Sequence, residues 1–144
     1  MPPPPLLSIV VPMFNEEAVL PLFVERLRPV ADGLGVDYEV LAVDDGSIDG
    51  TAIGLQRLLR QWPHLRVLRL RANAGHQAAI SAGLAKARGD YVVTLDADLQ
   101  DPPEVLAEKV DSVLFAGEEF TTIEIVLKDG DEMVVLRTGV RHEN

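Results

Sequence analysis

The chain has 144 residues, 47% of them apolar, and a formal net charge of −10. This length and apolar content are typical of one folded domain with a real core, and no apolar run approaches the roughly 18 residues of a membrane span. The absence of cysteine excludes disulfides and thiolate metal sites and favours a reducing compartment. The negative charge argues against nucleic acid or an anionic membrane surface as the main partner.

Four strand–helix cycles are predicted in chain order. The apolar run 7–11 is expected to be a buried strand that stops at Pro12, and a helix opens at Asn15 with Glu16 and Glu17 in its first turn. The next three cycles pair a strand with the helix that follows it: 38–43 with a helix from Thr51, 66–70 with a helix over 76–88, and 91–95 with a helix from Pro102. This alternation predicts an α/β fold, a mostly parallel sheet with helices on both faces.

Two of these helices carry further signals. The helix over 76–88 is expected to bury Ile80 and Leu84 and to end at Gly89 as its C-cap. Asp101 is placed to cap the helix from Pro102, and Glu104 completes a capping box with it.

The pattern changes beyond about Gly117. Residues 120–127 have strand character, Asp129-Gly130 is a hairpin signal, and 132–140 are expected to pair back. Residues 111–144 hold 8 acidic and 3 basic side chains, a net of −5, so a quarter of the chain carries half the charge. We therefore predict a proline-rich tail (1–6), an α/β domain (7–117) and an acidic C-terminal β-hairpin tail (118–144), and the hairpin or a second subunit of a homo-oligomer could cover an open edge of the sheet.

Polar side chains follow each of the four predicted strands: Asn15 and Glu16, Asp44 and Asp45, Asn73, and Asp96 and Asp98. The carboxyl ends of parallel strands meet at one edge of the sheet, where open α/β sheets bind ligands. We therefore expect these groups to form one site.

Asp96 and Asp98 are the candidate metal ligands. They lie two residues apart at a strand end and so point to the same side if the strand geometry persists. With the Gln100 amide they suit Mg²⁺ or Mn²⁺ rather than zinc. The alternative is a solvated polar turn, but the position beside the other polar clusters favours metal binding.

Two further clusters allow two interpretations each. Asp44 either binds a ligand, which we favour, or builds a turn before a helix capped by Asp49. The turn Asn73-Ala74-Gly75 places backbone N–H groups at a helix start, where anions bind, and His76 either reaches a diphosphate there or is an exposed first-turn histidine. No serine lies in a nucleophile-elbow pattern, so a hydrolase triad is not supported.

Four motifs, in this order, resemble those of family 2 glycosyltransferases: Val10-Val11-Pro12-Met13-Phe14-Asn15-Glu16-Glu17, Val43-Asp44-Asp45-Gly46-Ser47, Asn73-x-Gly75-His76-Gln77 and Asp96-Ala97-Asp98-Leu99-Gln100-Asp101-Pro102-Pro103-Glu104. The last two are similar to the polyprenyl-phosphate branch, which includes dolichol-phosphate mannose synthase and undecaprenyl-phosphate glucosyl transferases. Over residues 7–110 the resemblance implies the nucleotide-sugar-binding half of a GT-A fold.

The resemblance also implies a reaction. A polyprenyl phosphate would attack the anomeric carbon of a UDP- or GDP-sugar with inversion, at the cytoplasmic side of a membrane, and no catalytic base is identified. Asp98 and Gln100 would hold the divalent ion, Asp96 would lie near ribose and metal, and His76 would lie on the phosphate side. The nucleoside pocket would be lined by Pro12, Phe14, Glu16 and Asp44.

The sequence departs from the family pattern in two places. Ala72 stands where these enzymes often have arginine, and the family continues beyond the matched segment with residues that build the acceptor half of the site. A truncated module that binds a nucleotide sugar without transferring it is therefore the alternative. Sugar-phosphate nucleotidyltransferases and Asp-x-Asp phosphatases are disfavoured, because their motifs follow the first strand.

Overall fold

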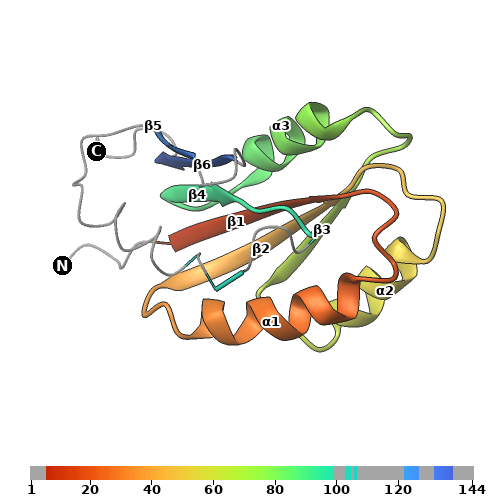
Figure 1. Cartoon of the computed structure of the whole chain (residues 1–144), viewed down its shortest axis with the longest axis horizontal. Coiled ribbons are helices and arrows are strands. Elements are labelled where there is room, and N and C mark those ends of the chain that lie inside the picture. Colours follow the sequence, from red (N-terminus) through yellow and green to blue (C-terminus); the bar gives the residue numbers. More distant parts are fainter. Residues whose placement is uncertain (1–5, 99–102, 105, 107–121, 127–131, 138–144) are drawn as a thin grey trace.

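The computed structural model of the chain describes residues 6–98, 103–104, 106, 122–126 and 132–137. Their helices and strands, labelled in Figure 1, are β1 (Leu6–Met13), α1 (Leu20–Asp32), β2 (Asp37–Asp44), α2 (Thr51–Leu59), β3 (Leu65–Arg69), α3 (His76–Lys86), β4 (Tyr91–Thr94), β5 (Thr122–Val126) and β6 (Glu132–Arg137). No helix of the described residues is long and apolar enough to cross a membrane.

All six strands belong to one sheet, in the order β3-β2-β1-β4-β6-β5. Strands β1 to β4 pair in parallel, which confirms the predicted mostly parallel α/β sheet. Strands β5 and β6 form the predicted hairpin, and β6 pairs antiparallel with β4. The hairpin thus covers the sheet edge at β4. The strand order reverses between β1 and β4, and such a switch point is where open α/β sheets bind ligands.

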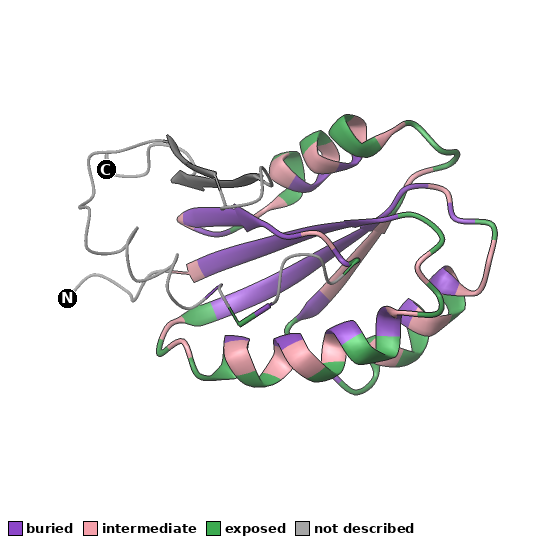
Figure 2. Cartoon of the chain, in the orientation of Figure 1, coloured by how far each residue is buried: buried purple, intermediate pink, exposed green. Residues whose placement is uncertain are grey.

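Helices lie on both faces of the sheet, as predicted: α1 and α2 on one, α3 on the other (Figure 1). Figure 2 shows that the central strands are buried along most of their length. In β1, Ile9 and Val11 point to the larger core, which includes residues of α1 and α2, whereas Val10 points to the smaller core beneath α3. Burial on both faces explains the continuous apolar run of this strand.

Strand β1 continues through Pro12 to Met13, so the predicted end at Pro12 is wrong. The Val10 carbonyl accepts from Leu95 on the β4 side, and the Met13 carbonyl accepts from Asp45 on the β2 side. By alternation, Pro12 faces the β4 side, where the ladder has already ended at the pair Val10–Thr94. Its missing N–H therefore removes no ladder bond.

Helix α1 begins at Leu20 rather than at the predicted Asn15. Asn15 has a φ of 53°, in the left-handed region that a right-handed helix excludes. The backbone N–H groups of Asn15, Glu16 and Glu17 bond to side chains of the β2–α2 loop and of Thr51, the first residue of α2. These tertiary hydrogen bonds outweigh the local helix-start signal.

Helix α3 lies on the sheet through small residues. Ala79 and Gly83 are buried, whereas Ile80 and Leu84, which we predicted to be buried, are only half-buried. A Cβ at Gly83 would lie 2.4 Å from Cγ1 of Val10 in β1. The helix backbone therefore approaches the sheet too closely for larger side chains to lie between them.

The predicted C-cap role of Gly89 is wrong, because α3 ends at Lys86 with an extended Ala87 as its cap residue. Gly89 lies instead against β1, where its N–H donates to Ser8 Oγ at 2.8 Å. The Ser8 hydroxyl donates in turn to Glu39 at 2.6 Å, and Glu39 also accepts from the Arg88 backbone and the Arg66 guanidinium. This buried network fastens the chain after α3 to β1, β2 and β3.

Of the helix predicted from Pro102, the structure describes only Pro103, Glu104 and the buried Leu106. The Glu104 carboxylate pairs with Arg26 of α1, with Nη2 to Oε1 at 2.6 Å. The capping partner predicted for Glu104, Asp101, lies outside the described residues. The ion pair fastens the chain after β4 to α1.

Candidate functional site

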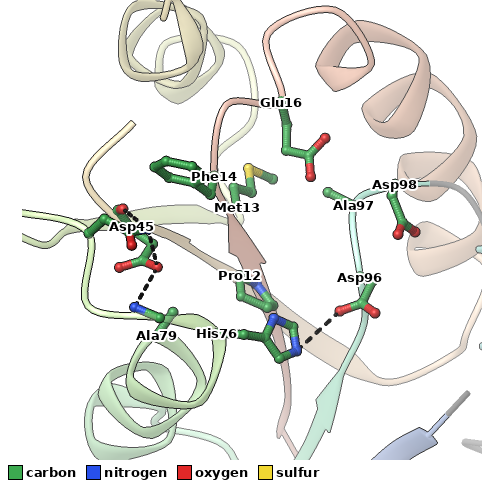
Figure 3. Close-up of a pocket in the computed structure, with 12 residues that line it drawn as sticks. Pro12, Met13, Phe14, Glu16, Asp45, His76, Ala79, Asp96, Ala97 and Asp98 are labelled. Atoms are coloured by element: carbon green, nitrogen blue, oxygen red, sulfur yellow. Dashed lines mark hydrogen bonds and ion pairs between the residues drawn. The ribbon is translucent and has the colours of Figure 1, made fainter. Parts of the chain in front are cut away.

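A cavity of about 340 Å³ lies where β1 and β4 end, at the switch point of the sheet (Figure 3). Its lining comes from the end of β1, from the segments that follow β1, β2, β3 and β4, and from the start of α3: Pro12, Met13, Phe14, Glu16, Asp45, Asn73, Gly75, His76, Ala79, Asp96, Ala97 and Asp98. Eight of the residues expected at the site are therefore brought together: Pro12, Phe14, Glu16, Asp45, Asn73, His76, Asp96 and Asp98. Gln100 lies outside the described residues.

The structure does not bring Asp44 to the cavity. Its side chain is fully buried, Oδ1 accepts from the Ser47 N–H at 3.0 Å, and Oδ2 lies 3.5 Å from Arg69 Nε. Asp44 thus builds the turn after β2, which is the alternative that the sequence left open.

Asp45, which we expected at the same edge of the sheet but did not favour as the ligand-binding carboxylate, lines the cavity instead. Strand periodicity holds the signal that was missed. Asp44 has the parity of Tyr38, Val40 and Ala42, which point into the larger core. Asp45, the next residue, therefore does not point into this core, and it lines the cavity.

The carboxylate of Asp45 holds the loop between β3 and α3. It accepts from the Ala74 N–H at 2.7 Å, from the Gly75 N–H at 3.0 Å and from the Asn73 side-chain amide at 3.0 Å. We expected the backbone N–H groups of this turn to bind an anion. In this structure two of them bind an internal anion, the Asp45 carboxylate.

The cavity carries concentrated negative charge. The pKa of Glu16 is raised, first by burial and then by repulsion from Asp98, Asp49 and Asp96. Asp96 lies near a basic group as well, since its Oδ1 is 3.7 Å from Nε2 of His76 at the start of α3 (Figure 3). The aspartates that follow β4 therefore disfavour the ionised form of Glu16.

These residues fit a divalent cation that is shared with a ligand. Asp96 and Asp98 both line the cavity (Figure 3) and offer hard carboxylate oxygens. In the described part of the chain, no three His, Cys, Asp or Glu side chains are grouped to hold a metal by themselves. Mg²⁺ is typically bound by one or two carboxylates together with substrate phosphates. The donor set therefore suits an ion completed by phosphate oxygens.

Solved structures show that the fold is that of GT-A glycosyltransferases. The mannosyltransferase of Pyrobaculum calidifontis, in complex with GDP-Man and Mn²⁺, is similar with a TM-score of 0.67 over 93% of this chain and 45% of that one, at 24% identity. The glucosyl-3-phosphoglycerate synthase of Mycobacterium tuberculosis, in complex with Mn²⁺, UDP and phosphoglyceric acid, has a TM-score of 0.62 over 82% and 42%, at 30% identity.

The chain belongs to Glycosyl transferase family 2, whose pattern matches residues 8–134. The undecaprenyl-phosphate 4-deoxy-4-formamido-L-arabinose transferase of Aeromonas hydrophila is 43% identical over 110 residues, which cover 76% of this chain and 34% of that protein. The chain spans about a third of the length of the curated relatives it matches. The predicted family and fold are thus confirmed.

Proposed function

We propose that this chain supplies the donor site of a glycosyltransferase that takes a UDP- or GDP-sugar together with Mg²⁺ or Mn²⁺. The observation that carries the proposal is the convergence of Glu16, Asp96 and Asp98 with His76 on one cavity at the switch point of a GT-A sheet. The solved structures with GDP-Man or UDP and Mn²⁺ support the donor class. The relatives named as undecaprenyl-phosphate transferases support a polyprenyl phosphate as acceptor.

Each lining residue then has a role. Pro12 and Phe14 offer an apolar wall for the base, and Asp45, rather than Asp44, is the residue of this pair that lines the cavity and holds the loop before His76. Asp96 and Asp98 would hold the divalent ion, with Gln100 as a proposed further ligand, and His76 lies on the phosphate side. The ion would neutralise charge on the departing diphosphate.

A phosphate acceptor explains why no general base is needed. Its second pKa is about 6, so an oxygen is largely ionised at neutral pH and ready to attack. That oxygen would bond to the anomeric carbon as the bond from this carbon to the diphosphate oxygen breaks, with inversion. A lipid-linked acceptor places the reaction at a membrane surface, which we propose is the cytoplasmic one.

Calorimetry with UDP and GDP, with and without Mn²⁺, tests the donor site. We expect Mn²⁺ to tighten nucleotide binding in the wild type and to have no such effect in Asp98→Ala. The matched control is Asp37→Ala, an exposed aspartate at the start of β2 and away from the cavity. If the wild type binds nucleotide with the same affinity with and without Mn²⁺, the metal assignment is wrong.

Transfer of labelled sugar from UDP- and GDP-sugars to undecaprenyl phosphate tests the reaction. The second candidate is a nucleotide-binding module without transfer. Metal-dependent binding with no transfer would support this module. Binding of neither nucleotide would rule out both functions.

A further inference from the structure

The loop after β1 (residues 14–19) and the loop after β2 (residues 45–50) are interlocked, and we refer to them as the paired loops. Three successive backbone N–H groups of the first loop donate to side chains at or beside the second: Asn15 to Ser47 Oγ at 2.9 Å, Glu16 to Thr51 Oγ1 at 2.9 Å, and Glu17 to Asp49 Oδ2 at 3.2 Å. The acceptors are spaced two residues apart, at positions 47, 49 and 51.

The intervening residues of the second loop return the interaction. The Ile48 N–H donates to Asn15 Oδ1 at 3.0 Å, and the Gly50 N–H donates to Glu17 Oε1 at 2.9 Å. Five hydrogen bonds therefore join two segments more than 30 residues apart in sequence. They also hold Asn15 in a left-handed conformation, which is sparsely populated and persists where its surroundings over-determine it.

Thr51 lies at the centre of this arrangement and is fully buried. Its hydroxyl donates to Asp49 Oδ1 at 2.6 Å and accepts from the Glu16 N–H at 2.9 Å. The hydroxyl has a single proton, so donation to Asp49 turns its lone pairs toward Glu16. The pair Asp49–Thr51 therefore defines where the Glu16 backbone sits.

We propose that Thr51 is a positioning residue of the donor site, which holds Phe14 and Glu16 at the cavity by fixing the Glu16 backbone. Phe14 and Glu16 line the cavity, whereas Thr51 does not, so Thr51 acts through the paired loops. Both lining residues precede the start of α1. The Glu16 carbonyl accepts from the Val19 and Leu20 N–H groups, and the Thr51 hydroxyl holds the Glu16 N–H on the other side of the residue. If Phe14 and Glu16 are already held in the binding geometry, ligand binding does not have to order them, and the affinity is higher. This inference rests on the proposed function.

The test compares two substitutions of Thr51. Thr51→Val keeps the shape but removes the hydroxyl, which leaves the Glu16 N–H without its acceptor, and Thr51→Ser keeps the hydroxyl. We expect Thr51→Val to weaken UDP or GDP binding with Mn²⁺ about tenfold, the effect of one lost buried hydrogen bond. Hydrogen exchange at the Glu16 amide should become faster in the same variant. Thr51→Ser should resemble the wild type in both measurements.

Leu55→Val is the matched control, since Leu55 is a buried core residue of the same helix and makes no bond to the paired loops. It should lower the melting temperature without changing nucleotide affinity. Asn15→Gly provides a second test, because it permits the left-handed backbone but removes one acceptor. We expect it to weaken binding too, and this variant decides the question if Thr51→Val does not fold.

The outcomes separate the two proposals. A Thr51→Val protein with faster Glu16 exchange but wild-type affinity would overturn the positioning role and leave the donor site intact. Equal losses in Thr51→Val and Leu55→Val would also overturn it, since the effect would then follow stability alone. If the wild type binds neither nucleotide, the proposed function fails and the positioning role fails with it.

Discussion

Helix α3 rests on the sheet at Gly83, and one added methyl group there tests how closely this contact positions the cavity. In Gly83→Ala, the new Cβ would lie 2.4 Å from Cγ1 of Val10 and 3.1 Å from Cγ2 of Val43. Carbon atoms pack best at roughly 3.5–4.0 Å, so the first contact is too short by more than about 1 Å. Both valines are fully buried and stiff at χ1, so they have no free rotamer into which to retreat.

Two effects of opposite sign decide the stability of Gly83→Ala. Overpacking a core usually costs about 1–3 kcal/mol, whereas alanine in place of glycine in a helix gains about 1 kcal/mol. The overlap is large and the neighbours are rigid, so we expect the clash to prevail with a net loss of about 1 kcal/mol in urea unfolding. Ser81→Ala, at an exposed position of the same helix, is the control and should gain a few tenths of a kcal/mol from propensity alone.

The same change should reach the cavity. Helix α3 begins at His76, whose Nε2 lies 3.7 Å from Asp96 Oδ1, and relief of the clash moves the helix away from the sheet. We therefore expect weaker nucleotide binding in Gly83→Ala and unchanged binding in Ser81→Ala. If Gly83→Ala is as stable as Ser81→Ala, α3 does not rest on this glycine and the reasoning fails.

Three further predictions concern carboxylates. Burial raises the pKa of Glu39, but its hydrogen bonds outweigh burial and lower it below the ordinary 4.5, so the wild type should lose stability in urea as the pH falls below about 4.5, and Glu39→Gln should not show that loss. Burial and nearby carboxylates raise the pKa of Glu16, so the ionised group destabilises the ligand-free fold; Glu16→Gln should raise the melting temperature at pH 7 but not below pH 4.5. Asp45→Asn turns an amide toward a backbone N–H and should cost about 1–3 kcal/mol in urea unfolding, a loss that the control Asp37→Ala should not show.

The repeating patterns were enough to predict the α/β order, because each cycle has its own local signal. The alternation of side chains along β2 could also have predicted that Asp44 faces the core and that Asp45 does not. The pattern of large apolar residues misled at α3, where Ile80 and Leu84 are more prominent in the sequence than Ala79 and Gly83. The buried stripe there is set by the distance between helix and sheet, which no local pattern encodes.

The start of α1 shows why the hydrogen bonds between the paired loops could not be predicted from the sequence. Acidic residues after Asn15 favour a helix start, yet their N–H groups find acceptors more than 30 residues away. Such a bond depends on the neighbouring strand and becomes visible only when β1 and β2 are paired. The antiparallel pairing of β6 with β4 is of the same kind, because the hairpin signal says nothing about its partner.

The carboxylates at the cavity determine how a negatively charged ligand can bind there. The N–H groups that Asp45 binds offset its charge, whereas Glu16 is repelled by Asp96 and Asp98, and His76 lies near Asp96. A nucleoside diphosphate brings further negative charge into this field, and like charges in a partly buried site repel strongly. A divalent cation, which Asp98 would help to hold, would offset that repulsion with its positive charge. Glu16→Gln and Asp98→Ala should therefore have different effects on nucleotide binding, because the first relieves repulsion and the second removes a proposed metal ligand.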